Sequence, residues 1–303
     1  MLLGLINSMP SAIAQGLIWG IMAIGIYVTY KILDIADLTV DGSLCTGGAT
    51  CVILLVNGCP MWLALICSIL AGMLAGLITG ILITKLKIPA ILAGILTQLA
   101  LYSINLHIMG FGTTSFSKSN LPISVDKYSL LVSSRYVREL SLRNPIIMVI
   151  LFVAIVIAIL YWFFGTELGC SIRATGANQF MARSQGINTD KTKVIGLVIS
   201  NSLVALSGAL LSQYQGFADI NMGRGAIVIG LAAVIIGEQL FDKVFKNFAL
   251  KLFACVLGAI IYYLVIQFVL KLGLSTDDLK MLTAIVVAIF LAIPNLKKGT
   301  KSC

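Results

Sequence analysis

The chain has 303 residues, of which 59% are hydrophobic and only 11% charged, and its mean hydropathy is +1.04. Soluble domains are about 45–50% apolar and about 25% charged, so this composition excludes a water-soluble enzyme. The long apolar runs exclude a disordered chain or a coiled coil. Several runs reach the ~20 residues that a membrane-spanning helix needs. We expect an all-α, polytopic integral membrane helical bundle, with residues 1–303 forming one transmembrane domain in the lipid bilayer.

The formal net charge of +9 does not point to a nucleic-acid partner in such a chain. Membrane proteins concentrate Lys and Arg in their cytoplasmic loops, and a basic balance follows from that bias. The N-terminal sequence has no basic region or small-residue cleavage site, so we expect its first apolar run to be a retained span.

In chain order, the apolar runs predict about nine membrane segments (eight to ten): residues 11–30, 40–57, 61–84, 88–109, 145–164, 194–214, 224–241, 248–270 and 279–294. Two polar interruptions separate them, a loop at residues 110–144 and a second segment at residues 165–193. If successive spans cross the membrane in alternating directions, most short basic clusters lie on the same side as residues 165–193. The positive-inside rule identifies that side as cytoplasmic. Residues 110–144 are then extracytoplasmic, although this loop also carries basic residues, and longer loops follow the rule less strictly.

The first membrane interruption lies near residues 34–43, where Asp34, Asp37 and Asp41 stand between two apolar runs. Carboxylates are expensive in hydrocarbon and mark functional positions there. A helix broken against protein or a water-filled path would accommodate them, and Gly42, Gly47 and Gly48 favour such a break. The alternative is an ordinary surface loop in which Asp37 or Asp41 caps the following helix.

Polar side chains inside apolar runs are the candidates for a translocation path. A first group lies at the predicted break and a second in the 88–109 run, where positions 98, 102 and 105 share one helical face. Each of these side chains could equally form a satisfied hydrogen bond between helices. The candidates are Asp37, Thr39, Asp41 and Ser43, followed by Thr97, Gln98, Tyr102 and Asn105, with Asn201 and Gln213 as weaker ones.

Small residues recur at helical spacing in two places, at Gly16 and Gly20 and at Gly72, Gly76 and Gly80. Such ladders allow helix backbones to approach closely in lipid. We expect them to pack helices within one bundle, with a seam between two copies of the chain as the alternative.

Signatures of enzymatic chemistry are missing from the sequence. It contains no G-x-x-x-x-G-K-[ST] run for nucleotide binding and no G-x-S-x-G or H-E-x-x-H motif. His107 is the single histidine, and the seven cysteines form no C-x-x-C pair, so we expect no metal site and no cofactor in this chain. The sequence predicts a transport role and not an enzyme.

The polar segment 165–193 contains the most informative pattern. It predicts a short helix from about Ala177 to Gln185, ended by Gly186 in a left-handed conformation. Asn188 or Thr189 would then cap the next membrane helix. Phe180 and Met181 give the short helix an apolar patch that water does not favour. Either a docked partner covers this patch, or the segment lies on the lipid headgroups.

This segment resembles the pattern "G-r-x-x-R-A-x-G-x-N-x-x-a-A-x-x-x-G-I-n" of permease subunits in ABC importers of the branched-chain amino acid and ribose type. The matching residues are Gly169, Arg173, Ala174, Gly176, Asn178, Ala182, Gly186, Ile187 and Asn188. The span 198–210 and the two stretches Gly20–Gly25 and Ile35–Ser43 are also similar to the family, so the resemblance covers about residues 11–294.

The resemblance implies a permease in a bacterial cell membrane that acts as a homodimer. It implies two ATP-binding-cassette ATPase subunits, which would hold the ATP and Mg²⁺, and an extracytoplasmic substrate-binding protein. The residues that would couple this chain to the ATPase are Arg173, Ala174, Gly176, Asn178, Phe180, Met181, Ala182, Gly186 and Ile187.

Two details refine the resemblance. Many relatives carry an acidic residue in the coupling segment where this chain has Phe180-Met181-Ala182. The run from Asp37 to Ser43 is most similar to the subgroup associated with tryptophan or tyrosine uptake, which implies an amino acid as cargo. An ion-gradient-driven secondary transporter is the alternative function, because broken helices with intramembrane carboxylates also fit that class.

Overall fold

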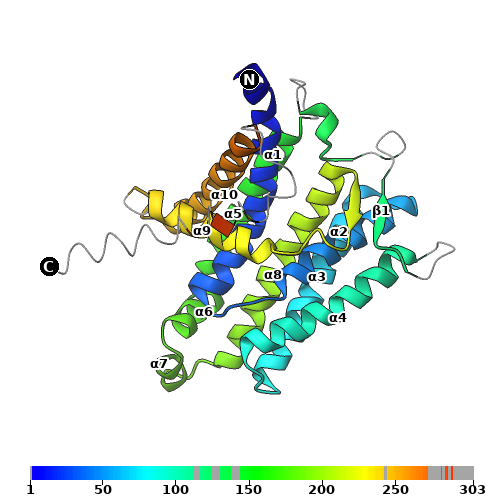
Figure 1. Cartoon of the computed structure of the whole chain (residues 1–303). Coiled ribbons are helices and arrows are strands. Elements are labelled where there is room, and N and C mark those ends of the chain that lie inside the picture. Colours follow the sequence, from blue (N-terminus) through cyan, green and yellow to red (C-terminus); the bar gives the residue numbers. More distant parts are fainter. Residues whose placement is uncertain are drawn as a thin grey trace.

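A computed structural model of the chain describes residues 2–111, 117–123, 128, 130–137, 144–241, 244–271 and the single positions 281, 284, 285 and 288 (Figure 1). Its helices are α1 (Leu2–Tyr27) with its π-helical continuation η1 (Val28–Ile32), α2 (Val40–Val56), α3 (Met61–Thr84), α4 (Ala90–Gly110), the 3₁₀ turn η2 (Ser134–Tyr136), α5 (Pro145–Phe164), α6 (Glu167–Ala177), α7 (Gln179–Ser184), α8 (Thr189–Gln215), α9 (Ala226–Phe241) and α10 (Phe248–Lys271). Two short strands, β1 (Asn120–Pro122) and β2 (Phe217–Asp219), pair in antiparallel register, with Asn120 opposite Asp219.

The all-α membrane bundle agrees with the prediction from the sequence, but nine full spans are not confirmed. In the described residues, six helices are long and apolar enough to cross a membrane, while α2 and α9 are shorter apolar helices. The predicted ninth segment, 279–294, lies outside the described residues apart from four single positions.

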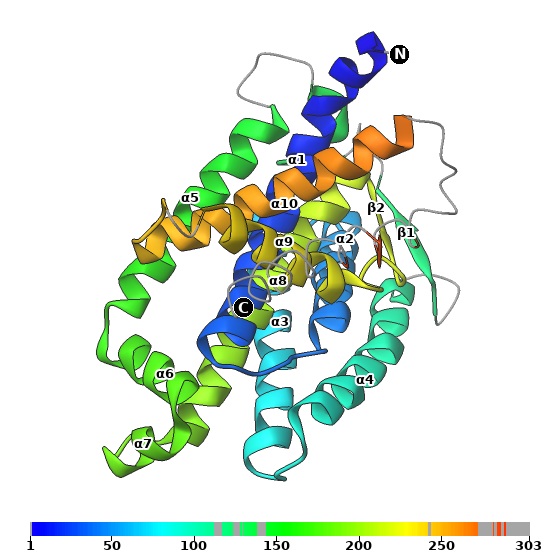
Figure 2. The same ribbon diagram turned by 60° about the vertical axis from the view of Figure 1, so that its left-hand side comes forward.

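The centre of the bundle is formed by α1 and α8. Residues of α1 such as Ile18, Ile21 and Met22 are fully buried, because α8, α9, α10 and α5 all pack around this helix. In turn, α8 packs against both α2 and α3. Turned by 60°, the molecule shows α5 on one flank of this centre and α4 on the other, with α10 running across α1 (Figure 2).

The glycine ladders pack helices of the same chain, as predicted. A Cβ at Gly72 or Gly76 would overlap backbone carbonyls of α8, and one at Gly16 would lie 2.7 Å from the Cα of Ile260 in α10. Close backbone approach supplies van der Waals contact where lipid gives no hydrophobic drive between helices. The outer faces of α3, α4 and α5 instead carry exposed large apolar side chains such as Leu74, Leu96 and Trp162, as expected of surfaces that meet lipid.

The break predicted near residues 34–43 is shorter than expected. After η1 the chain is non-helical from residue 33 to 39, and α2 already begins at Val40, so Asp41, Gly42 and Ser43 lie in its first turn. Gly47 and Gly48 do not break the helix. A Cβ at Gly47 would overlap the carbonyl of Ala205, so this glycine serves the crossing of α2 and α8.

Candidate functional site

A buried polar network lies beside the non-helical segment that joins η1 to α2. Asp37 is 3% exposed, and both of its carboxylate oxygens accept hydrogen bonds, one from the backbone N–H of Thr39 at 2.9 Å and one from Asn201 Nδ2 at 2.7 Å. The Oδ1 atom of Asn201 accepts in turn from the hydroxyl of Ser43 at 2.6 Å. Burial of a carboxylate is costly unless hydrogen bonds compensate it, and this network supplies them.

Threonine hydroxyls extend the network to α3 and α4. Thr39 Oγ1 lies 2.8 Å from Thr79 Oγ1, which donates to Thr97 Oγ1 at 3.0 Å. Four path candidates, Asp37, Thr39, Ser43 and Thr97, therefore lie in a satisfied interhelical network. Among the weaker candidates, Asn201 is its central member, whereas Gln213 Oε1 accepts from the N–H of Leu131 elsewhere in the bundle.

Asp41 caps a distant helix rather than its own. Its carboxylate accepts from the N–H groups of Gly225 at 3.0 Å and Ile227 at 2.9 Å, at the beginning of α9. An acidic side chain at a helix N-terminus satisfies free N–H groups and complements the helix dipole. This contact ties α2 to a segment more than 180 residues further along the chain.

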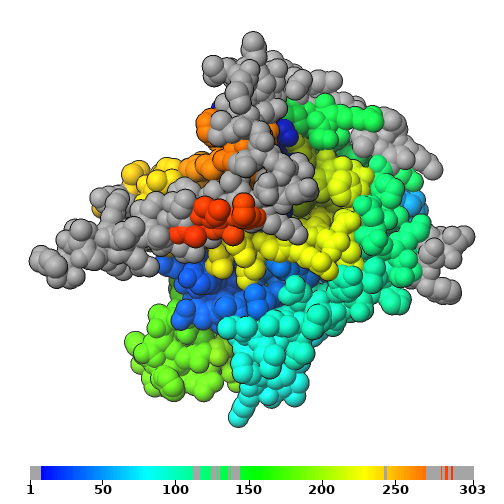
Figure 3. Space-filling model, in the orientation of Figure 1, coloured from blue at the N-terminus to red at the C-terminus, as the bar shows by residue number. Residues whose placement is uncertain are grey.

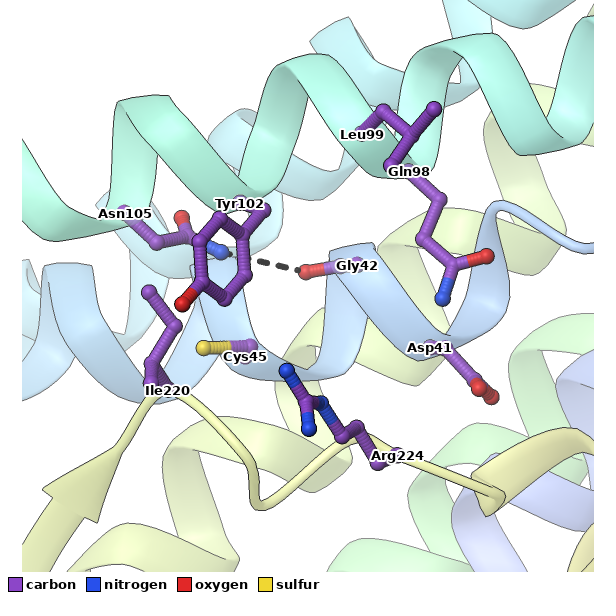
Figure 4. A pocket seen from close by; sticks show the side chains of 9 residues that line it. All are labelled: Asp41, Gly42, Cys45, Gln98, Leu99, Tyr102, Asn105, Ile220 and Arg224. Carbon is purple, nitrogen blue, oxygen red and sulfur yellow. Dashed lines mark hydrogen bonds between the residues drawn. The ribbon is translucent and has the colours of Figure 1, made fainter. Parts of the chain in front are cut away.

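The remaining path candidates line a cavity of about 480 Å³ between α2, α4 and the turn that precedes α9. Figure 4 shows its lining residues: Asp41, Gly42, Cys45, Gln98, Leu99, Tyr102, Asn105, Ile220 and Arg224. The helical spacing of 98, 102 and 105 thus brings three predicted polar residues to one cavity. Asn105 Nδ2 donates to the Gly42 carbonyl at 3.5 Å, while its Oδ1 has no hydrogen-bond partner in the described part of the chain.

Arg224 is the charged residue among the cavity residues that the sequence analysis missed. It lies in the turn at residues 220–225, within a region predicted to begin a membrane span at residue 224. The signal that would have revealed it is a single arginine between two glycines, Gly223 and Gly225, at the junction of two apolar runs. Non-helical backbone at membrane depth is tolerated where it is buried in protein or lines a water-filled cavity.

The 165–193 segment forms two short helices, where one was predicted. Asn178 has an extended backbone (φ −158°, ψ 108°) and separates α6 from α7, so the helix expected to begin at Ala177 begins at Gln179. The Oδ1 atom of Asn178 accepts from the N–H groups of Phe180 and Met181. Gly186 has a φ of +80° as predicted, and Asn188 caps α8 by accepting from the N–H of Lys191 at 3.1 Å.

The residues of this segment face in two directions. Phe180 and Met181 are 85% and 64% exposed, whereas Ala182 is buried. Arg173 instead turns toward its own chain, with its guanidinium carbon 4.3 Å from the ring centroid of Phe248. Gly176 lies against η1, where a Cβ would overlap the carbonyl of Ile32. Of the remaining residues of the predicted coupling set, Ala174 lies in α6 and Ile187 donates its N–H to the Ala182 carbonyl at 3.0 Å.

A bundle with six apolar helices long enough to cross a membrane, and with a cavity between α2, α4 and the turn before α9, fits a multi-pass membrane protein. The sequence model of the branched-chain amino acid transport system permease component matches residues 8–294, and the chain belongs to this family. It is thus a permease subunit of an ABC-type transporter, a class that works with ATPase and substrate-binding partners, and it is not itself an enzyme.

Individual relatives agree with this assignment. The chain is 43% identical to a tyrosine transport system permease protein of Clostridioides difficile over 96% of this chain and 92% of the relative. It is 27% identical to a ribose import permease protein of Haemophilus influenzae over 77% of this chain and 69% of the relative. The fold is similar to a solved structure described as an inward-facing metal-chelate type ABC transporter, with a TM-score of 0.53, 14% identity and coverage of 95% of this chain and 85% of that one.

Proposed function

We propose that this chain is the membrane-spanning permease of an ATP-driven ABC importer in a bacterial cell membrane, and that it moves an amino acid of the aromatic class inward by alternating access. The similarity to a tyrosine transport permease over nearly the whole chain carries this proposal. Two copies of the chain would pair with two ATPase subunits, which hold ATP and Mg²⁺, and with an extracytoplasmic substrate-binding protein.

The α7 helix is the proposed coupling element. It has only six residues, yet Asn178 caps its beginning and Gly186 ends it. Arg183 fixes it to α8, with Nε donating to Thr189 Oγ1 at 2.7 Å and a terminal nitrogen 3.3 Å from Asp190. A short helix held at both ends, with Phe180 and Met181 outward, presents a rigid apolar knob that fits a groove in a partner.

Coupling needs contacts that differ between two states of the complex. When the ATPase pair closes on ATP, a knob seated in each ATPase would move with it, and α6 would carry that movement to η1 through Gly176. The side of the membrane from which the cavity between α2 and α4 can be reached would then change. An ion-gradient-driven carrier offers no comparable use for α6 and α7.

The proposal is tested by purifying the tagged permease from its native membrane and measuring co-purified ATPase and ATP hydrolysis. Phe180→Asp and Met181→Asp place a charge in an apolar groove, so we expect each to lose most of the bound ATPase while the permease still inserts. Gln185→Asp is the matched control, since it adds the same charge at the exposed end of α7 without removing an apolar contact. Unchanged ATPase recovery and uptake in both apolar-to-Asp variants would contradict the coupling role.

A further inference from the structure

Arg224 occupies the cavity described above without a counter-charge. In the described part of the chain it forms no ion pair and no side-chain hydrogen bond, and the two ion pairs found there join Lys31 to Glu238 and Arg183 to Asp190. Asp41, the carboxylate that lines the same cavity, is committed to the N–H groups at the beginning of α9. The Arg224 side chain is exposed at this cavity, so its guanidinium is accessible to a ligand.

We propose that this cavity is a transient binding site for the cargo within the permease, and that Arg224 binds the carboxylate of the transported amino acid. The inference rests on the proposed function, because it assumes that the cargo is an amino acid. A guanidinium presents paired N–H donors that match both oxygens of a carboxylate, which makes arginine suited to this contact.

The turn that carries Arg224 is firmly held. Gly223 packs directly on the carbonyl of Asp41, where a Cβ would overlap it, and the Arg224 N–H donates to the carbonyl of Asn221 at 3.1 Å. Gly225 follows with a φ of +85°, a conformation that favours glycine. The three residues 223–225 therefore fix the backbone beneath Arg224, and the side chain extends from that support into the cavity (Figure 4).

The other cavity walls suit an amino acid. Gln98 and Tyr102 offer polar groups from α4, and Leu99 and Ile220 offer apolar surface. A cavity of about 480 Å³ lies within the range that holds a small molecule. The residues come from α4 and the segment before α9, and these two parts of the chain lie next to each other on one face of the molecule (Figure 3).

The first test compares uptake with ATP hydrolysis in the complete transporter, reconstituted with its ATPase and binding protein and supplied with L-tyrosine. Arg224→Gln removes the charge but keeps a polar side chain, so we expect at least a tenfold lower rate of uptake. Binding-protein-stimulated ATP hydrolysis should stay within about twofold of wild type, because docking and coupling lie elsewhere. Arg224→Lys should recover part of the uptake, and Lys85→Gln, at an exposed cation outside the cavity, should leave it unchanged.

A second test bypasses the selectivity of the binding protein. The purified permease–ATPase complex is heated with L-tyrosine or with L-tyrosinamide, in which a neutral carboxamide replaces the carboxylate. We expect L-tyrosine to raise the unfolding temperature and L-tyrosinamide not to do so, with the difference lost in Arg224→Gln. Equal effects of the two compounds, or no effect of either, would overturn the assignment.

The outcomes separate the two proposals. If the wild-type complex takes up L-tyrosine under ATP and Arg224→Gln does so equally well, the cavity assignment fails and the proposed function stands. If the wild-type complex shows no ATP-driven amino acid uptake, the proposed function fails. If Arg224→Gln instead dissociates the permease pair, Arg224 meets a carboxylate of the second copy and the cargo site is refuted.

Discussion

At the scale of single residues, Asp37 illustrates how a carboxylate is accommodated inside an apolar bundle. Both of its oxygens accept hydrogen bonds, and its partner Asn201 is itself satisfied by Ser43 and by the Leu197 carbonyl. Each member has its donors and acceptors matched, so the network specifies one arrangement of α2 against α8. Removing one partner leaves another group buried without a bond, which costs about 1–3 kcal/mol.

Asp37→Asn should therefore destabilise the protein by about 2 kcal/mol, because the amide N–H group of the new side chain would face Asn201 Nδ2, which is also a donor. Asp34→Asn is the matched control. Asp34 is exposed and has a φ of +54°, a conformation that Asn accepts well, so this change should have little effect. Thermal unfolding of the purified permease in detergent measures both. Equal unfolding temperatures for the two variants would show that the Asp37 network contributes nothing to stability.

The contrast between Asn105 and Asp37 shows which site residues a sequence can indicate. Gln98, Tyr102 and Asn105 lie in one helix, so the helical period alone places them on one face. Asn201, the partner of Asp37, is 164 residues away in the sequence. The helix that Asp41 caps begins at Ala226, which is 185 residues after Asp41. Local periodicity contains no information about such pairings. Composition alone does not distinguish Arg224 from a cation at a membrane surface, and only the glycines on either side of it in the sequence mark it.

At the scale of elements, α6 and η1 form the contact through which the coupling segment meets the bundle. Gly176 lies directly on the Ile32 carbonyl, Arg173 stacks on Phe248, and Thr175 Oγ1 lies 2.9 Å from Thr192 Oγ1 of α8. The resemblance to the family marked Arg173 and Gly176 as coupling residues, and within this chain both also contact the bundle, Arg173 at Phe248 and Gly176 at Ile32. The sequence also predicted one helix here, because the extended backbone of Asn178 is set by capping and not by helix propensity.

Gly176→Ala should separate α6 from η1, since the added methyl group has no space beside the Ile32 carbonyl. We expect a loss of about 1–3 kcal/mol, the range typical of overpacking, together with ATP hydrolysis that is poorly coupled to uptake. Gly165→Ala is the milder comparison in the same region, because its Cβ would make a tight contact of 3.2 Å with the Trp162 carbonyl oxygen and not an overlap, and its φ of −83° suits alanine. Unfolding temperature and the ratio of uptake to hydrolysis test the change. A Gly176→Ala protein with wild-type values for both would show that α6 does not transmit force by this contact.

At the scale of the whole molecule, basic residues gather at one end of the bundle. The turn between α3 and α4, with Lys85 and Lys87, lies at the same end as α6 and α7, and α1 begins at the opposite end (Figure 1). One cavity of about 370 Å³ collects Lys31, Arg173, Lys246 and Lys251 beside α6. Cations from distant parts of the chain thus gather near the α6–α7 segment, which under the positive-inside rule favours a cytoplasmic location for that end.

Two native cysteines offer a test of this orientation. Cys170 is exposed on α6, and Cys59 is partly exposed in the turn between α2 and α3. Tyr128, from the predicted outer loop, donates to the carbonyl of Val56 just before that turn, so Cys59 belongs to the opposite end from Cys170. In variants that retain only one cysteine, a membrane-impermeant maleimide should label Cys59 in intact cells. It should label Cys170 only in inside-out vesicles, and it should leave the buried Cys255 unlabelled in both.

The reverse pattern would place α7 outside the cell, out of reach of any ATPase. The coupling proposal and the orientation would then fail together, because a cytoplasmic ATPase can act on this bundle only if the end that carries Phe180 and Met181 faces it.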